Sequence, residues 1–142
     1  WPTAWALGEA SPQEIDERGI VACLRTAAER ALAQLWNDGL NPSDCVILLD
    51  GTHNWLAGIT PAPAAIRVQA KADRDCSIVA AASIIAKVER DRRMVLASAS
   101  APHYAWEANK GYGSAAHLAG IATHGPHDLH RRSWIRLPDA TA

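Results

Sequence analysis

Two acidic residues occupy positions where this chain could carry out metal chemistry. Asp50 directly follows the apolar run 45–49, and Asp73 comes shortly after the alternating segment 65–70. Phosphodiester hydrolysis by two metal ions requires several carboxylates around ions about 4 Å apart. Mg²⁺ suits this role because it takes oxygen ligands and keeps waters that a substrate can displace. An acid at a strand end is also a common turn former or helix cap. Asp73 could cap the next helix, although Asp75 is better placed to do so.

A second group of polar residues follows on the segment after Asp73. On a helix with about 3.6 residues per turn, Ser83, Lys87, Arg90 and Asp91 share one face. Lysine and arginine on such a face can bind phosphates, a contribution that does not depend on base sequence. The alternative is that both cations pair internally with Asp91 or Glu89. The sequence leaves these two interpretations open.

Hydrophobic periodicity predicts the elements that position these residues. Ser11, Pro12 and Glu14 form a capping-box pattern at a helix start. The continuous apolar run 45–49 is typical of a strand buried on both faces. The order of expected strands and helices along the chain indicates an α/β layer with helices packed on a sheet. Asp50 and Asp73 then lie just past strand ends, where such sheets bind ligands. The expected elements are strands 4–8, 45–49 and 65–70, helices 11–36, 77–97 and 114–123, a loop over 52–63, and an irregular segment 127–142.

Composition sets the broad class of the protein. The 142 residues are 49% apolar and 20% charged with a net charge of −1, so we expect one globular domain. Nucleic-acid contact would have to come from local basic clusters, of which residues 90–93 and 131–132 provide two. Three cysteines without metal-ligand spacing predict free thiols in a reducing compartment. The six histidines form no convincing zinc set. The absence of a signal peptide or membrane-length apolar run favours a cytoplasmic protein without membrane contact.

Several motifs together resemble one known family. They are Leu49-Asp50-Gly51, Lys71-Ala72-Asp73, the sequence of residues 80–92 in the expected long helix, Asn109-Lys110-Gly111-Tyr112-Gly113 and His130-Arg131-Arg132-Ser133-Trp134. From about residue 5 to residue 134 the chain resembles ribonuclease HII, a metal-dependent endonuclease that cuts RNA in RNA/DNA duplexes. The resemblance implies a ribonuclease H-like mixed sheet with flanking helices. It also implies one domain over 1–142, with sheet and helices to about 98 and a C-terminal helical and irregular extension over 99–142.

The resemblance also implies roles for individual residues. Asp50 and Asp73 would be the third and fourth catalytic carboxylates, ligating Mg²⁺ or Mn²⁺ in a two-metal site. Tyr112 would stack on the sugar after the ribonucleotide, because an aromatic face packs on deoxyribose but meets the 2′-OH of ribose. Ala72 replaces the family's glycine. The other implied substrate contacts are Lys110, Lys87, Arg90 and Ser83, and the implied structural clasp is His130, Arg131, Arg132 and Ser133.

The implied activity is cleavage of the RNA strand of RNA/DNA hybrids, 5′ of ribonucleotides at RNA–DNA junctions, by a monomer acting in DNA repair. The family's Asp-Glu-x-Gly-Arg-Gly motif, which carries two further carboxylates, is absent from these 142 residues, and the chain begins with Trp1. We therefore expect a longer reading frame or a processed chain, and we expect these residues alone to be inactive. The alternative is a remnant that binds nucleic acid or a partner without cleavage. A small-molecule enzyme is not supported, because no Gly-rich phosphate loop or G-x-S-x-G motif occurs.

Overall fold

The structure, a computed structural model, describes residues 4–136. The chain divides into two compact units, Trp1–Ala86 and Lys87–Ala142, which are described here one at a time. The boundary between them falls within a long helix, twelve residues before the expected start of the extension at 99. The expectation of a single domain over 1–142 stays a prediction. No helix among residues 4–136 is both long and apolar enough to cross a membrane.

The first unit begins with an irregular segment, so the expected strand 4–8 is wrong. Residues 4–10 form neither helix nor strand. Gly8 approaches helix α2 (Ile20–Asn37) so closely that a Cβ atom there would lie 1.7 Å from the Ala27 carbonyl oxygen. The apolar residues of this segment therefore follow a helix surface instead of pairing in a sheet.

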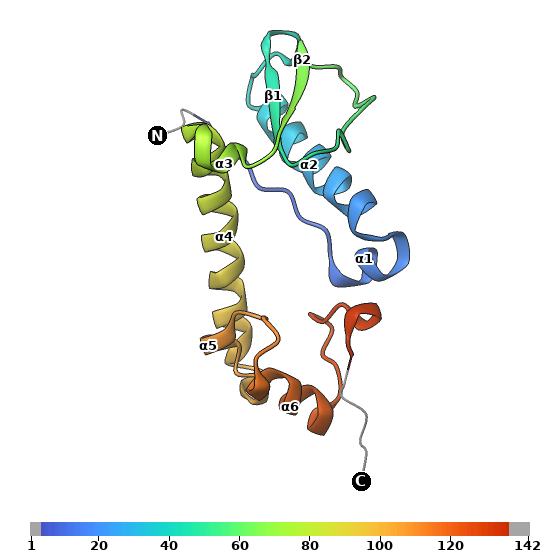
Figure 1. Cartoon of the computed structure of the whole chain (residues 1–142), viewed down its shortest axis with the longest axis vertical. Coiled ribbons are helices and arrows are strands. Elements are labelled where there is room, and N and C mark those ends of the chain that lie inside the picture. Colours follow the sequence, from blue (N-terminus) through green and yellow to red (C-terminus); the bar gives the residue numbers. More distant parts are fainter. Residues whose placement is uncertain (1–3, 137–142) are drawn as a thin grey trace. The chain divides into compact units, whose positions relative to one another are not determined.

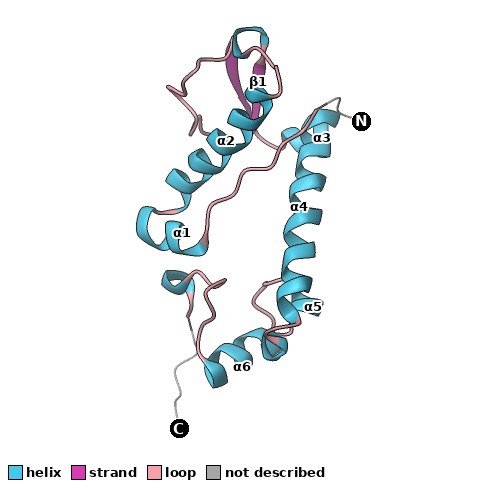
Figure 2. Cartoon of the chain, turned by 180° about the vertical axis from the view of Figure 1, so that it is seen from behind, coloured by secondary structure: helices cyan, strands magenta, loops and turns pink. Residues whose placement is uncertain are grey.

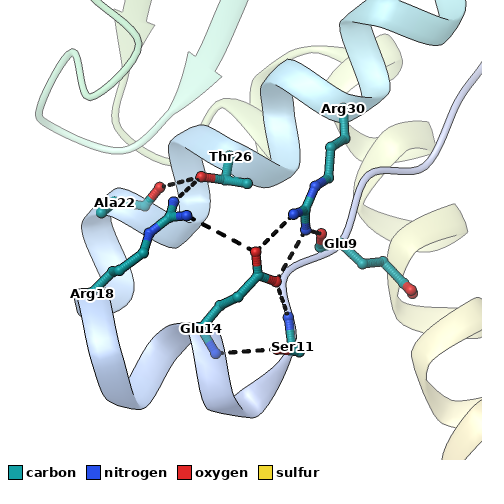
Figure 3. A network of polar contacts seen from close by, with 7 residues as sticks. All are labelled: Glu9, Ser11, Glu14, Arg18, Ala22, Thr26 and Arg30. Atoms are coloured by element: carbon teal, nitrogen blue, oxygen red, sulfur yellow. Dashed lines mark hydrogen bonds and ion pairs between the residues drawn. The ribbon is translucent and has the colours of Figure 1, made fainter.

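Helix α1 (Pro12–Arg18) starts with the predicted capping box, drawn in Figure 3. The Glu14 N–H donates to Ser11 Oγ at 3.1 Å, and the Ser11 N–H donates to Glu14 Oε2 at 2.8 Å. Arg30, on α2, places Nη2 2.7 Å from Glu14 Oε1. The Arg30 hydrogen bond and then the Ser11 N–H lower the pKa of Glu14 to about 2. The network joins α1 to α2.

The single helix expected over 11–36 is divided into two. Gly19 has a left-handed backbone (φ 79°), and its N–H donates to the Ile15 carbonyl at 2.9 Å, which ends α1. The apolar spacing continues across the break, so periodicity did not reveal it. The predicted end of α2 near Asn37 is confirmed.

The sheet of the described residues is a parallel pair, β1 (Val46–Asp50) and β2 (Ala65–Gln69), which lie side by side in Figure 1. Val46 pairs with Ala65, and Asp50 pairs with Gln69. Both strands were predicted, and the α/β class is confirmed. Burial of β1 on both faces is wrong, because Val46 is 58% exposed and only Leu49 is buried.

The core of this unit lies between the strand pair and α2. Leu49, Leu56 and Ile59 are buried, and Leu32 and Trp36 of α2 pack against them. The expected loop after β1 contributes two of the three buried residues, and Leu56 is fully inaccessible. The loop is therefore part of the core that fixes the end of β1.

Two helices follow β2. The four-residue α3 (Ala72–Asp75) was not predicted, whereas α4 (Ser77–Ser98) confirms the expected long helix. The absence of Gly and Pro over its 22 residues explains its length. Several apolar side chains of α4 are exposed, including Ile78 at 60% and Val88 at 59%.

The second unit is built from short helical segments, which Figure 2 shows as cyan ribbons between pink loops. Helix α6 was predicted closely: Ser114 Oγ accepts the His117 N–H at 3.3 Å, and Gly125 ends the helix. A small buried core contains Ala101, Tyr104, Trp106 and Ile121. The shorter segments are η2 (Pro102–Tyr104), α5 (Trp106–Asn109), α6 (Ala115–His124) and η3 (Arg132–Trp134).

Candidate active site

The two candidate metal ligands lie next to the same short helix. Asp50 ends β1, and its Oδ1 accepts the Ala72 N–H at 2.8 Å. Ala72 is the first residue of α3 and Asp73 is the second. Both carboxylates belong to exposed residues. Asp50 thus holds the start of the helix that carries Asp73, which keeps the two acids near one another.

The turn into α3 accommodates an alanine where the family has glycine. The left-handed residue of this turn is Lys71 (φ 59°, ψ 35°), whereas Ala72 already belongs to the helix. The Ala72 side chain is completely buried. A methyl group therefore fills space at this position, and no glycine is needed for the backbone conformation.

The carboxylates of Asp50 and Asp73 are suitable ligands for Mg²⁺ or Mn²⁺, but two carboxylates are too few for a complete site. Carboxylate oxygens are the ligands that these ions prefer. Within residues 4–136, however, no three His, Cys, Asp or Glu residues come together to form a metal-binding group. Asp50 and Asp73 are therefore the acidic part of a site that needs further ligands.

The second unit positions Tyr112 on a loop that we call the tyrosine loop, residues 109–114. The Asn109 side chain donates to the Tyr104 carbonyl and accepts the Gly111 N–H, both at 2.8 Å. The Tyr112 N–H donates to the Asn109 carbonyl at 2.9 Å, and the Tyr112 carbonyl accepts the Ser114 N–H at 2.8 Å. These bonds fix the backbone on both sides of the aromatic ring.

The left-handed turn of this loop explains part of the Lys-Gly-Tyr motif. Lys110 (φ 52°) and Gly111 (φ 85°) are both left-handed, and glycine adopts that conformation without strain. A Cβ atom on Gly111 would also lie 3.3 Å from the terminal methyl carbon of Met94. Lys110 directs its ammonium group to the Glu107 carbonyl. Its predicted role in substrate binding stays a prediction.

Tyr112 presents its ring to solvent. The side chain is 58% exposed, and the Arg90 guanidinium carbon lies 4.6 Å from the ring centroid. This cation–π contact packs Arg90 against the ring. The ring is therefore accessible to a ligand, and its role in stacking on a sugar stays a prediction.

Lys87 and Arg90 make the internal ion pairs that the sequence had left open. Lys87 Nζ lies 2.5 Å from Asp91 Oδ2, and Arg90 Nη2 lies 2.7 Å from Asp91 Oδ1. The hydrogen bond from Lys87, followed by that from Arg90, lowers the pKa of Asp91. Both cations are largely exposed, so these pairs are weak and a phosphate can compete for them. Ser83, also exposed, lies one helical turn before Lys87.

The His130–Ser133 cluster is tied to its own unit. His130 is 8% exposed, and the Arg131 guanidinium lies 4.6 Å from the Trp134 ring centroid. Arg132 pairs with Asp128 at 3.2 Å, and Ser133 is exposed. These contacts suit the expected clasp. Sequence reasoning missed His117, whose ring contacts His130, because residues thirteen positions apart across a helix end have no shared periodicity.

Comparison with known proteins defines the class to which this fold and these motifs belong. The ribonuclease HII family profile matches residues 6–137. Ribonuclease HII of Streptomyces griseus is 45% identical over 140 residues, which cover 96% of this chain and 56% of that protein. Ribonuclease HII of Nitrosococcus oceani is 38% identical over 131 residues, covering 92% of this chain and 60% of that protein. The chain belongs to the ribonuclease HII family and spans a little over half the length of these relatives.

Proposed function

We propose that the protein containing this chain is an endoribonuclease that hydrolyses the RNA strand of RNA/DNA hybrids and cuts 5′ of ribonucleotides at RNA–DNA junctions. Family membership supports the ribonuclease class. The observation that carries the proposal is the bond from the Ala72 N–H to Asp50, which links Asp50 to the helix bearing Asp73. Such cleavage would serve the removal of ribonucleotides from DNA. That the protein acts as a cytoplasmic monomer stays a prediction.

The proposed reaction is hydrolysis of one phosphodiester. Water attacks phosphorus, and the bond to the 3′ oxygen of the preceding nucleotide breaks, leaving a 3′-hydroxyl and a 5′-phosphate. Asp50 and Asp73 would hold Mg²⁺ or Mn²⁺, which supplies an activated water and neutralises charge on the leaving oxygen. The hydrogen bond to Asp50 Oδ1 fixes the carboxylate, so this ligand is oriented before an ion arrives. We propose that activity also requires the two carboxylates of the family's Asp-Glu-x-Gly-Arg-Gly motif, and that these 142 residues alone are inactive.

Recognition of the substrate would fall to the second unit. The exposed Tyr112 ring offers an apolar face to a deoxyribose, whereas a ribose would bring its 2′-OH against the ring. Arg90 lies against that ring and also reaches Asp91, so it can exchange the carboxylate for a phosphate beside the sugar. Lys87 shares the same carboxylate and would contact phosphate in the same way. Lys110 of the second unit, together with Ser83 near the end of the first unit, completes the proposed substrate contacts.

A second candidate function is nucleic-acid binding without cleavage. It is favoured by the absence of any group of three potential metal ligands within the described residues. The two proposals differ in their dependence on Asp50 and on metal. Binding alone would be insensitive to a chelator, whereas cleavage requires the ion.

The test uses the full-length product of the reading frame and a labelled DNA duplex with one embedded ribonucleotide. We expect cleavage in Mg²⁺ or Mn²⁺ that EDTA abolishes and that Asp50→Asn reduces by at least about 100-fold, since loss even of outer-shell support costs 10–100-fold. Asp38→Asn, which changes an exposed acid at the end of α2, is the matched control. Duplex binding without cleavage, unchanged in Asp50→Asn and in EDTA, would establish the second candidate instead.

A further inference from the structure

Two buried histidines connect the C-terminal segment to the tyrosine loop. His117 of α6 is 5% exposed and His130 is 8% exposed. Their Nε2 atoms lie 2.8 Å apart. His130 Nδ1 lies 2.8 Å from the backbone nitrogen of His127, and His117 Nδ1 lies 2.8 Å from the Tyr112 carbonyl oxygen. We call this chain of three hydrogen bonds the histidine relay.

The two ends of the histidine relay determine where its protons lie. A backbone N–H can only donate, so His130 Nδ1 must accept from His127. The His127 carbonyl lies farther from the same nitrogen, at 3.2 Å, and it also accepts the His130 N–H at 2.9 Å; the shorter contact with the His127 N–H decides the assignment. A carbonyl can only accept, so His117 Nδ1 must donate to Tyr112. The remaining proton then lies on His130 Nε2 and is donated to His117 Nε2. Both rings are neutral in this arrangement.

The surroundings of the relay favour the neutral state. Burial is the main cause that lowers the pKa of His130; the backbone contact with His127 acts in the opposite direction, and the neighbouring imidazoles of His117 and His127 lower the pKa further. The Tyr104 and Trp106 rings lie 4.7 Å and 5.4 Å from the His130 ring, between centroids. Trp106 Nε1–H also points to His117 Nε2 at the longer distance of 3.4 Å and shares its one lone pair with the His130 Nε2–H, which agrees with that nitrogen being an acceptor. Aromatic rings thus pack against His130 in the buried core.

We propose that His117 and His130 are positioning residues that hold the Tyr112 backbone, and thereby its ring, in the orientation that discriminates deoxyribose from ribose. The inference rests on the proposed function, because it assigns Tyr112 to the sugar after the ribonucleotide. The Tyr112 carbonyl accepts one bond from Ser114 within the loop and one from His117 outside it. The histidine bond therefore ties the Tyr112 carbonyl to the buried core of its unit, while the Asn109 side chain ties the start of the loop to the Tyr104 carbonyl.

Two substitutions at His117 separate positioning from general stability. An asparagine nitrogen lies close to the place of Nδ1, so His117→Asn keeps a donor to Tyr112 but leaves the His130 Nε2–H without an acceptor. A glutamine oxygen lies close to the place of Nε2, so His117→Gln keeps the bond to His130 but loses the bond to Tyr112. If the relay only stabilises the fold, His117→Asn should lower stability and activity more than His117→Gln, because it leaves a buried donor unsatisfied.

The measurement is the ratio of kcat/KM for a junction duplex to that for an all-RNA hybrid, in the full-length protein. We expect His117→Gln to lower this ratio by about five- to tenfold, the effect of one hydrogen bond, and His117→Asn to preserve it. In a Tyr112→Ala background, His117→Gln should leave the ratio unchanged, because the positioning acts through the tyrosine. Equal losses in both variants, or a further loss in the Tyr112→Ala background, would overturn the proposal.

A second measurement is independent of catalysis. Long-range ¹H–¹⁵N spectra of the full-length protein at neutral pH should show a proton on Nδ1 of His117 and on Nε2 of His130. Different tautomers, or a doubly protonated ring, would refute the relay itself. If the tautomers are as expected but wild-type protein cleaves no hybrid, then the proposed function fails while the hydrogen-bonded relay stands.

Discussion

The hydrogen bond between Asp50 and α3 can be separated from the charge of Asp50. Asp50→Asn retains an oxygen that can accept the Ala72 N–H, whereas Asp50→Ala removes the acceptor. A hydrogen bond to a charged group contributes roughly 1.5–3 kcal/mol, and the exposure of Asp50 reduces this value. We therefore expect Asp50→Ala to lower the free energy of unfolding by about 1 kcal/mol and Asp50→Asn by less than about 0.5 kcal/mol.

The assay is urea denaturation of the full-length protein in EDTA, so that metal binding does not contribute to stability. Activity measured in Mg²⁺ should be lost in both variants, because a neutral side chain is a poor ligand for the ion. The combination of near-wild-type stability and lost activity in Asp50→Asn is the diagnostic result. Equal destabilisation by asparagine and alanine would refute the idea that Asp50 Oδ1 organises the start of α3.

Three further substitutions test the Glu14 ion pair, the proposed phosphate contact of Lys87 and the close approach of Gly8 to α2. Because Arg30 lowers the pKa of Glu14 to about 2, the stabilisation by this carboxylate is complete above its usual pKa of 4.5 and is lost as pH falls from 4.5 towards 2. Glu89 and Asp91, whose pKa values are also lowered, lose stabilisation on acidification in both proteins, so acid titration should show a larger loss of stability in wild type than in Glu14→Gln; equal losses would contradict the role of Glu14. Replacing Lys87 by Gln should reduce the slope of log K against log salt for duplex binding by about one, since one phosphate contact is removed; an unchanged slope would leave Lys87 paired only with Asp91. Gly8→Ala should lower the midpoint of thermal unfolding, because its Cβ would overlap the Ala27 carbonyl; an unchanged midpoint would mean that the segment lifts from α2 without cost.

Local signals predicted those elements whose formation depends on neighbouring residues. Ser11 and Glu14 form the capping box that their spacing indicates, and Ser114 caps α6 in the same way. The uninterrupted alanine-rich segment forms α4 as expected. In each case the interacting residues are close together in the sequence, so local spacing is enough to predict the interaction.

Features that depend on distant partners could not be predicted. The approach of Gly8 to Ala27 and the bond from Ala72 to Asp50 join segments about twenty residues apart. Apolar character alone suggested that residues 4–8 form a strand, but tertiary contact with α2 determines their path. The His117–His130 contact was missed for the same reason, since neither residue belongs to a recognisable local pattern.

We propose that this chain contributes Asp50 and Asp73 to a metal-dependent ribonuclease that cuts at embedded ribonucleotides. The most direct measurement is mapping of the cut in a DNA duplex with one ribonucleotide, using full-length wild type and Asp73→Asn. We expect a single Mg²⁺- or Mn²⁺-dependent cut on the 5′ side of the ribonucleotide, with a 3′-hydroxyl product, and loss of that cut in Asp73→Asn. Cleavage of the all-DNA duplex at a comparable rate, or full activity of Asp73→Asn, would contradict it.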